Sequence, residues 1–212
     1  MPEMFKKNQK KIIELCKERD YDYMLWTPSN VEDILKHYPQ YRDFYNNLRF
    51  NIMRVDILRF LILHLYGGIY LDLDIEICNN FKLFELVKSN FACSQRDLFY
   101  ETKKRIFKEI EILQMVKNHP MVFTWIDYVI SQIKEKDAMN NYYEDKKMRY
   151  VLHTTGPYAF TRFVEKYNIP HFIFNGRNIE KGEEVGEWTN EQYISHYSCS
   201  YLKKEKGKVK IL

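Results

Sequence analysis

Several signals that define common protein classes are missing from this sequence of 212 residues. The four cysteines lie far apart, with neither a Cys-x-x-Cys pair nor a histidine at zinc-ligand spacing, so we interpret them as reduced thiols. Residues 1–11 are polar and basic and lack the apolar core of a signal peptide. The longest apolar run is interrupted by Arg59 and His64. We therefore expect no transmembrane segment and predict a soluble cytoplasmic protein, of a kind found in bacteria or viruses.

A continuous stripe of basic residues is also missing. Lys and Arg are spread along the chain and the net charge is only +4, which argues against nucleic acid as a partner. The hydrophobic share of 45% and the aromatic share of 16% argue against disorder, because they supply enough apolar area to offset the entropy of ordering the chain. Without an internal repeat or a clear linker, the length predicts a single domain over residues 1–212.

What the sequence does contain is a long apolar segment followed by a strictly alternating one. Residues 51–66 are apolar on nearly every side, which predicts a buried helix that ends at Gly67-Gly68. Residues 69–77 alternate between apolar and polar side chains, which predicts a strand with Tyr70, Asp72 and Asp74 on one face.

Further helices and strands are expected to alternate along the chain. We predict helices at 3–19, 31–37, 119–133 and 154–164, strands at 21–26, 91–94 and 171–174, and an irregular excursion at 97–108. This order predicts an α/β fold.

The two aspartates of the alternating segment suit a divalent cation. Asp72 and Asp74 are two residues apart on an extended segment, so both side chains leave the same face. Hard oxygen ligands at this spacing suit Mg²⁺ or Mn²⁺ at a phosphate-bearing substrate. The alternative is an ordinary half-exposed strand with acidic residues on its wet face. Spacing alone leaves both interpretations open.

The predicted helix carries two charged residues in apolar surroundings. Asp56 and Arg59 are three residues apart and share a helix face, so they predict either a plain intrahelical ion pair or part of a polar site.

Together these segments resemble a known family. Residues 54–59 (RVDILR) and 66–74 (YGGIYLDLD) closely resemble the DXD signature of glycosyltransferase family 32, which includes yeast initiating mannosyltransferases and bacterial capsule and polysaccharide transferases. The spacing is similar to that in the catalytic core of the large clostridial glucosylating toxins. The resemblance implies a GT-A fold, with a Rossmann-like mixed central sheet flanked by helices, and sugar transfer with retention.

The resemblance also implies roles for individual residues. Asp56 and Arg59 would touch the donor sugar, and Tyr70 would pack near the base or ribose. Asp72 would bridge ribose, sugar and metal, and Asp74 would hold the metal, Mn²⁺ or Mg²⁺, directly.

A weaker likeness extends to the C-terminal His and Ser segment. There His196 is a candidate metal or pyrophosphate ligand, with Ser198 and Ser200 as candidate phosphate contacts, although a lone histidine of this kind is more often an ordinary packed or surface residue. Family members usually carry an apolar first strand ahead of the segment that here begins at Met1, so the nucleotide preference stays open.

The leading expectation is a metal-dependent glycosyltransferase of polysaccharide or glycoprotein biosynthesis. It would move a hexose from a UDP- or GDP-sugar donor to a glycan or glycoprotein acceptor. Two alternatives stay open: a metal-dependent phosphohydrolase or nucleotidyltransferase that uses Asp72 and Asp74, and a catalytically degenerate sugar-binding domain. The segment 154–157 is interpreted as a helix cap in preference to a donor or acceptor loop.

Overall fold

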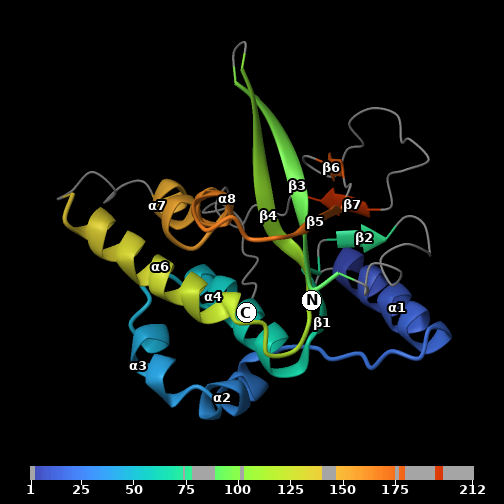
Figure 1. The fold of residues 1–212 in the computed structure, drawn as a ribbon. Coiled ribbons are helices and arrows are strands. Elements are labelled where there is room, and N and C mark those ends of the chain that lie inside the picture. Colours follow the sequence, from blue (N-terminus) through green and yellow to red (C-terminus); the bar gives the residue numbers. More distant parts are fainter. Residues whose placement is uncertain are drawn as a thin grey trace.

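Two small β-sheets and a set of helices make up the fold, which we describe from a computed structural model (Figure 1). The description covers residues 3–73, 75–77, 89–100, 103–139, 147–174, 177–179 and 194–197. The predicted α/β class is confirmed.

The larger sheet has the strand order β1-β4-β3-β5. Its strands are β1 (Gly68–Leu71), β3 (Phe91–Tyr100), β4 (Lys103–Met115) and β5 (Phe172–Phe174). The strand β4 is antiparallel to both β1 and β3, whereas β3 and β5 are parallel, so the sheet is mixed. A second sheet has the order β2-β7-β6, formed by β2 (Ile75–Ile77), β6 (Arg177–Ile179) and β7 (Ile194–Tyr197).

The helix α4 (Asn51–Tyr66) is the central helix that the apolar run predicts. Its buried residues lie on all sides and include Phe60 and Leu61, because the helix is covered by both the sheet and other helices. It ends at Gly67, whose φ of 73° lies in the left-handed region and where an added Cβ would come within 2.9 Å of the Lys117 backbone nitrogen. Glycine is needed here for both reasons.

Other helices enclose α4. The helices α2 (Pro28–Lys36) and α3 (Pro39–Asn46) pack against it from one side. The helices α6 (Met121–Asp137), α7 (Lys147–Thr154) and α8 (Pro157–Lys166) follow the hairpin of β3 and β4. The indole of Trp125 is fully buried among the rings of Phe60, Phe160 and Phe163.

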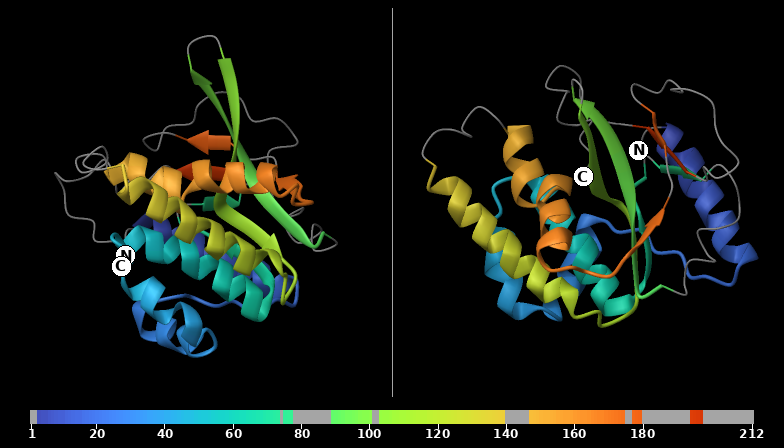
Figure 2. Two further views of the ribbon diagram at one scale, coloured as in Figure 1. Left: turned by 60° about the vertical axis from the view of Figure 1, so that its left-hand side comes forward. Right: turned by 45° about the horizontal axis from the view of Figure 1, so that its top comes forward.

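The larger sheet lies between two helical layers. Helices α4, α6, α7 and α8 cover one side, and α1 (Glu3–Glu18) lies on the other (Figure 2). The larger core cluster joins the helices to one side of the sheet, and a smaller cluster joins α1 to Ile75, Ala92 and Ile112. In this arrangement β1 pairs with β4, and both strands contact α4.

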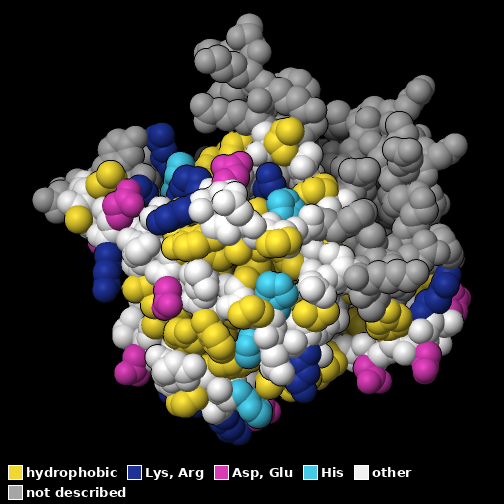
Figure 3. Space-filling view, in the orientation of Figure 1, with side chains coloured by type: hydrophobic (Ala, Val, Ile, Leu, Met, Phe, Trp, Pro, Cys, Tyr) yellow, Lys and Arg dark blue, Asp and Glu magenta, His cyan; other side chains and the backbone are white. Residues whose placement is uncertain are grey.

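The described residues show no concentration of one charge on the side that faces the viewer in Figure 1. There the described lysines and arginines are interspersed with acidic, histidine and apolar side chains (Figure 3). Among the described residues, no helix combines the length and the apolar character needed to cross a bilayer.

Several sequence predictions need correction. The alternating segment 69–77 is not one strand: β1 ends at Leu71 and β2 begins at Ile75 in the other sheet. Residues 21–26 have no regular secondary structure and pair with none of the described strands. The predicted excursion at 97–108 is instead part of the long hairpin of β3 and β4, which extends out of the body in Figure 1.

Other predictions are confirmed or extended. The predicted helices at 3–19, 31–37, 119–133 and 154–164 correspond to α1, α2, α6 and α8. The cap of α2 is Thr27, whose backbone nitrogen donates to the Asn30 side chain at 2.7 Å. The helices α3 and α7 were missed by the periodicity argument.

Candidate functional site

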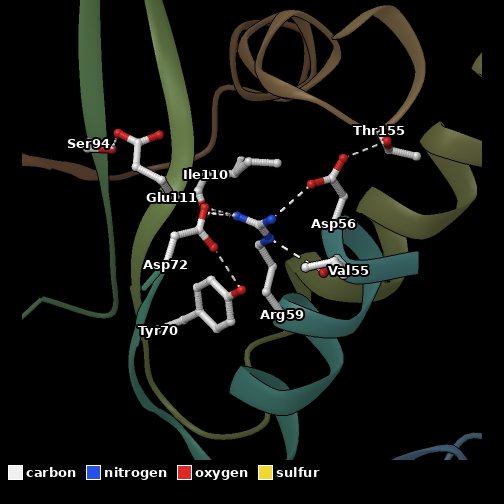
Figure 4. A network of polar contacts seen from close by, with 9 residues as sticks. All are labelled: Val55, Asp56, Arg59, Tyr70, Asp72, Ser94, Ile110, Glu111 and Thr155. Carbon is white, nitrogen blue, oxygen red and sulfur yellow. Dashed lines mark hydrogen bonds and ion pairs between the residues drawn. The ribbon is translucent and has the colours of Figure 1, made fainter. Parts of the chain in front are cut away.

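The guanidinium group of Arg59 is the centre of a buried polar network at the end of β1 (Figure 4). Arg59 and Asp56 come from α4, and each side chain is at most 5% exposed. The Nη2 atom of Arg59 donates to Oδ1 of Asp56 at 2.9 Å, which is the intrahelical pair that their spacing predicts. Such a pair is rarely left this deeply buried without further polar partners.

Those partners come from distant parts of the chain. The Nη1 atom of Arg59 donates to the Ile110 carbonyl oxygen at 2.6 Å. The Thr155 hydroxyl donates to the second Asp56 oxygen, Oδ2, at 2.8 Å. The Arg59 guanidinium also lies over the ring of Tyr70, with its carbon 4.9 Å from the ring centre.

Asp72 is the point where this network reaches the surface. Its side chain is 29% exposed and its Oδ2 lies 3.4 Å from Nη1 of Arg59. The Tyr70 hydroxyl donates to Oδ1 of Asp72 at 2.9 Å. The backbone nitrogen of Asp72 donates to the Glu111 carbonyl oxygen at 2.9 Å, which fixes the main chain just after β1. Asp72 is therefore held on three sides and remains partly open to solvent.

Burial shifts the pKa values of Asp56 and Tyr70. It raises the pKa of the Asp56 carboxyl to about 6, although the Arg59 charge and the Thr155 hydrogen bond act in the opposite direction. Burial also raises the pKa of the Tyr70 phenol, and the Asp72 charge adds to this shift. At neutral pH the network therefore holds an ionised Asp56 and a neutral Tyr70.

The structure thus brings together four predicted site residues, Asp56, Arg59, Tyr70 and Asp72. Asp74, Ser198 and Ser200 lie outside the described residues. For His196 the backbone alone is described, and it pairs with Ile75 between β7 and β2. This pairing places the C-terminal strand beside the segment that follows Asp74.

The oxygen donors of this region fit a hard divalent cation in their chemistry. Asp72 offers a partly exposed carboxylate, and a carboxylate beside a phosphate group is a usual environment for Mg²⁺ or Mn²⁺. Among the residues that the structure describes, no three His, Cys, Asp or Glu side chains cluster as a metal site, and Asp74 is not one of those residues.

Three contributing residues were missed by sequence reasoning. Thr155 lies in the segment that was interpreted as a helix cap, and its contact with Asp56 spans 99 residues. Glu111 and Ser94 come from β4 and β3, and the Ser94 hydroxyl donates to Oε1 of Glu111 at 2.6 Å. The alternation of Glu109, Ile110, Glu111 and Ile112 was a usable signal for a strand there.

The segment that carries Asp56, Arg59, Tyr70 and Asp72 also matches a known protein family. Residues 2–92 match the family described as "Glycosyltransferase sugar-binding region containing DXD motif". The predicted resemblance to DXD-containing glycosyltransferases is therefore confirmed over this part of the chain.

Similar proteins include yeast mannosyltransferases. Inositol phosphoceramide mannosyltransferase 3 of Schizosaccharomyces pombe is 42% identical over 80 residues, which are 37% of this chain and 22% of that protein. Inositol phosphoceramide mannosyltransferase 2 of the same organism is 26% identical over an alignment of 213 positions, which covers 94% of this chain and 54% of that protein. The chain thus spans about half of the second relative and less of the first.

A solved structure was also found. PaToxG Glycosyltransferase is 20% identical, with a TM-score of 0.35, over 63% of this chain and 40% of that chain.

Proposed function

We propose that this chain transfers a hexose from a nucleotide-diphosphate sugar to an acceptor hydroxyl, in a metal-dependent reaction that retains the anomeric configuration, on a fold of the GT-A type. The observation that supports this most strongly is the connection from Asp56 through Arg59 to Asp72. It joins a buried cation to the first aspartate of the DXD segment. An anionic diphosphate and a sugar would both find complementary groups there.

The metal would be held by Asp72 and Asp74, with His196 as a further candidate ligand. When bound, Mn²⁺ or Mg²⁺ supplies Lewis-acid stabilisation of the departing diphosphate. Ser198 and Ser200 are proposed to contact its phosphate oxygens.

The protein groups would position the donor. Arg59 provides a fixed positive charge that is already oriented by Asp56 and the Ile110 carbonyl, so little reorganisation is needed when negative charge develops. Asp56 would orient the sugar, and its two oxygens also hold Arg59 and Thr155. Tyr70 would pack near the base or ribose while its hydroxyl orients Asp72.

The acceptor hydroxyl would attack from the face that the diphosphate leaves. The new bond forms between the acceptor oxygen and the anomeric carbon, and the bond from that carbon to the phosphate oxygen breaks with its electron pair on the phosphate. The acceptor proton passes to the diphosphate. This front-face route accounts for retention without a covalent sugar-enzyme bond.

The names of the relatives suggest which sugar to test first. Both are named as mannosyltransferases that act on inositol phosphoceramide. We therefore propose mannose as the transferred sugar, with GDP-mannose and UDP-sugars as the donors to compare. The acceptor is proposed to be a glycan, a glycoprotein or an inositol phosphate headgroup. A cytoplasmic location stays a prediction.

The test compares donors with and without metal. Release of the nucleoside diphosphate from GDP-mannose, UDP-glucose and related donors is measured with Mn²⁺ and with a chelator, for the native chain and Asp74→Ala. Asp127→Ala serves as a matched control, because Asp127 is exposed on α6, away from the proposed site. We expect turnover that requires metal in the native chain and the control, and none in Asp74→Ala.

Other results would favour the alternatives. Donor binding without turnover in any sample indicates a degenerate sugar-binding domain. Release of inorganic phosphate or of a nucleoside monophosphate indicates a phosphohydrolase or nucleotidyltransferase. If no nucleotide-sugar binds or turns over, the proposal is wrong.

A further inference from the structure

A buried acidic group lies next to Asp72 on the neighbouring strand. Glu111 is on β4 and only 8% of the residue is exposed. Its carbonyl oxygen accepts the backbone hydrogen bond from Asp72 at 2.9 Å, so the two residues are adjacent across the strands. In Figure 4 both carboxylates lie on one side of Arg59, with Asp56 and Thr155 on the other. The sequence separation of the two residues gives no hint of this contact.

An irregularity between β3 and β4 includes Glu111. Cys93 pairs with Leu113, but Gln95 pairs with Lys108, so residues 109–112 of β4 form a bulge opposite Ser94. Bulges of this kind re-aim side chains and are frequent next to active sites. The Ile110 carbonyl oxygen, within this bulge, accepts from Arg59. The Glu111 carbonyl oxygen accepts from Asp72 because the register of β1 and β4, in which Leu71 pairs with Ile112, continues by one residue.

The charge of Glu111 has little compensation within the described part of the chain. There the Ser94 hydroxyl, at 2.6 Å from Oε1, is its one side-chain hydrogen-bond donor, and no described Lys or Arg forms an ion pair with it. Arg59 is bound to Asp56, Ile110 and Asp72 instead. Burying a carboxylate with a single neutral donor is costly, and an apolar residue at this position would stabilise the fold better.

We infer that Glu111 is a further catalytic residue, a carboxylate that faces the anomeric carbon of the donor sugar. This inference rests on the proposed function. When the bond from that carbon to the phosphate oxygen breaks, its electron pair leaves with the diphosphate and positive charge develops on the sugar. A fixed carboxylate stabilises this charge electrostatically and forms no bond itself. Ser94 is then a positioning residue that holds the carboxylate through its hydroxyl.

The test uses Glu111→Gln, which preserves the shape of the side chain and an oxygen that can accept the Ser94 hydrogen bond. We expect kcat for metal-dependent turnover of the donor to fall about 100-fold, while the affinity for the donor and the melting temperature stay near those of the native chain. Glu165→Gln is the matched control, since Glu165 is exposed on α8. A kcat of Glu111→Gln within about threefold of the native value would overturn the inference.

A second variant separates catalysis from folding. Ser94→Ala keeps the negative charge of Glu111 but removes the hydroxyl that positions its carboxylate. We therefore expect kcat per folded molecule to fall about 10-fold. If Glu111→Gln does not fold, an unchanged kcat in Ser94→Ala overturns the inference. Failure of the proposed function is recognised separately, because in that case the native chain and Glu165→Gln also show no turnover.

Discussion

The hydroxyl of Thr155 donates a hydrogen bond of 2.8 Å to Oδ2 of Asp56, and both residues are buried. This contact joins the segment before α8 to the middle of α4. It leaves Oδ1 of Asp56 for Arg59, so one carboxylate connects two parts of the chain that are 99 residues apart. The stability of the site therefore depends on a residue outside the DXD segment.

Replacing Thr155 by Val should destabilise the protein. The change keeps the shape and removes the donor, which leaves one oxygen of a buried carboxylate unsatisfied. We expect a loss of about 1–3 kcal/mol in the free energy of unfolding, measured with urea. Thr155→Ser should recover most of it. Equal stability of the Val variant and the native chain would show that the bond contributes nothing.

Replacing Arg59 by Ala should be more severe. Asp56 would then remain buried without its cation, which typically costs about 3–5 kcal/mol. Metal-dependent turnover should also be lost. The double variant Asp56→Ala/Arg59→Ala should cost less than the sum of the two single variants, because the pair is removed as a unit. Additive losses in urea unfolding would contradict this coupling.

Replacing Tyr70 by Phe should affect activity more than folding. The variant removes the hydrogen bond of 2.9 Å to Asp72 and keeps the ring under Arg59. We expect about a 10-fold loss in metal-dependent turnover, because the Asp72 carboxylate loses a group that orients it. Circular dichroism should be unchanged. Full activity in Tyr70→Phe would mean that other contacts suffice to orient Asp72.

The pH dependence of stability should contain a contribution from His153. Burial, together with the positive charges of Arg162, Arg149 and Lys136, lowers its pKa to about 4. Between pH 6.5 and 4 the unfolded chain thus binds more protons at this position than the folded chain does. The contribution of neutral His153 to stability is complete above pH 6.5 and is lost as the pH falls toward 4.

This contribution can be measured by comparing urea unfolding of the native chain and His153→Gln at pH 7.5, 5.5 and 4.5. The native chain should lose stability relative to the variant as the pH falls. NMR titration of the imidazole should give a pKa well below 6.5. An unshifted titration, or parallel pH profiles, would show that His153 is not buried against these cations.

The residues of the site are of two kinds, those that local patterns place and those that tertiary packing brings in. Asp56, Arg59, Tyr70 and Asp72 were predictable, because the periodicity of α4 and the alternation of β1 place them on known faces of local elements. The family resemblance then implied what they do together. Even so, the alternation at 69–77 suggested one strand, and the break after Leu71 was invisible in it.

The partners of these residues were decided by tertiary structure. Local periodicity says which way a side chain points but not what it meets. Thr155 reaches Asp56 because α8 packs on the sheet, and the Ile110 carbonyl reaches Arg59 because β4 bulges opposite Ser94.

Local sequence patterns are thus enough to define the helix α4, its end at Gly67 and the faces that carry Asp56, Arg59 and Asp72. The enclosure of Arg59 by three separate segments, and the position of Glu111 beside Asp72, follow from the packing of the whole chain. These contacts depend on strand register and on a bulge. Register and bulges are set by the packing of whole elements and not by the propensities of neighbouring residues.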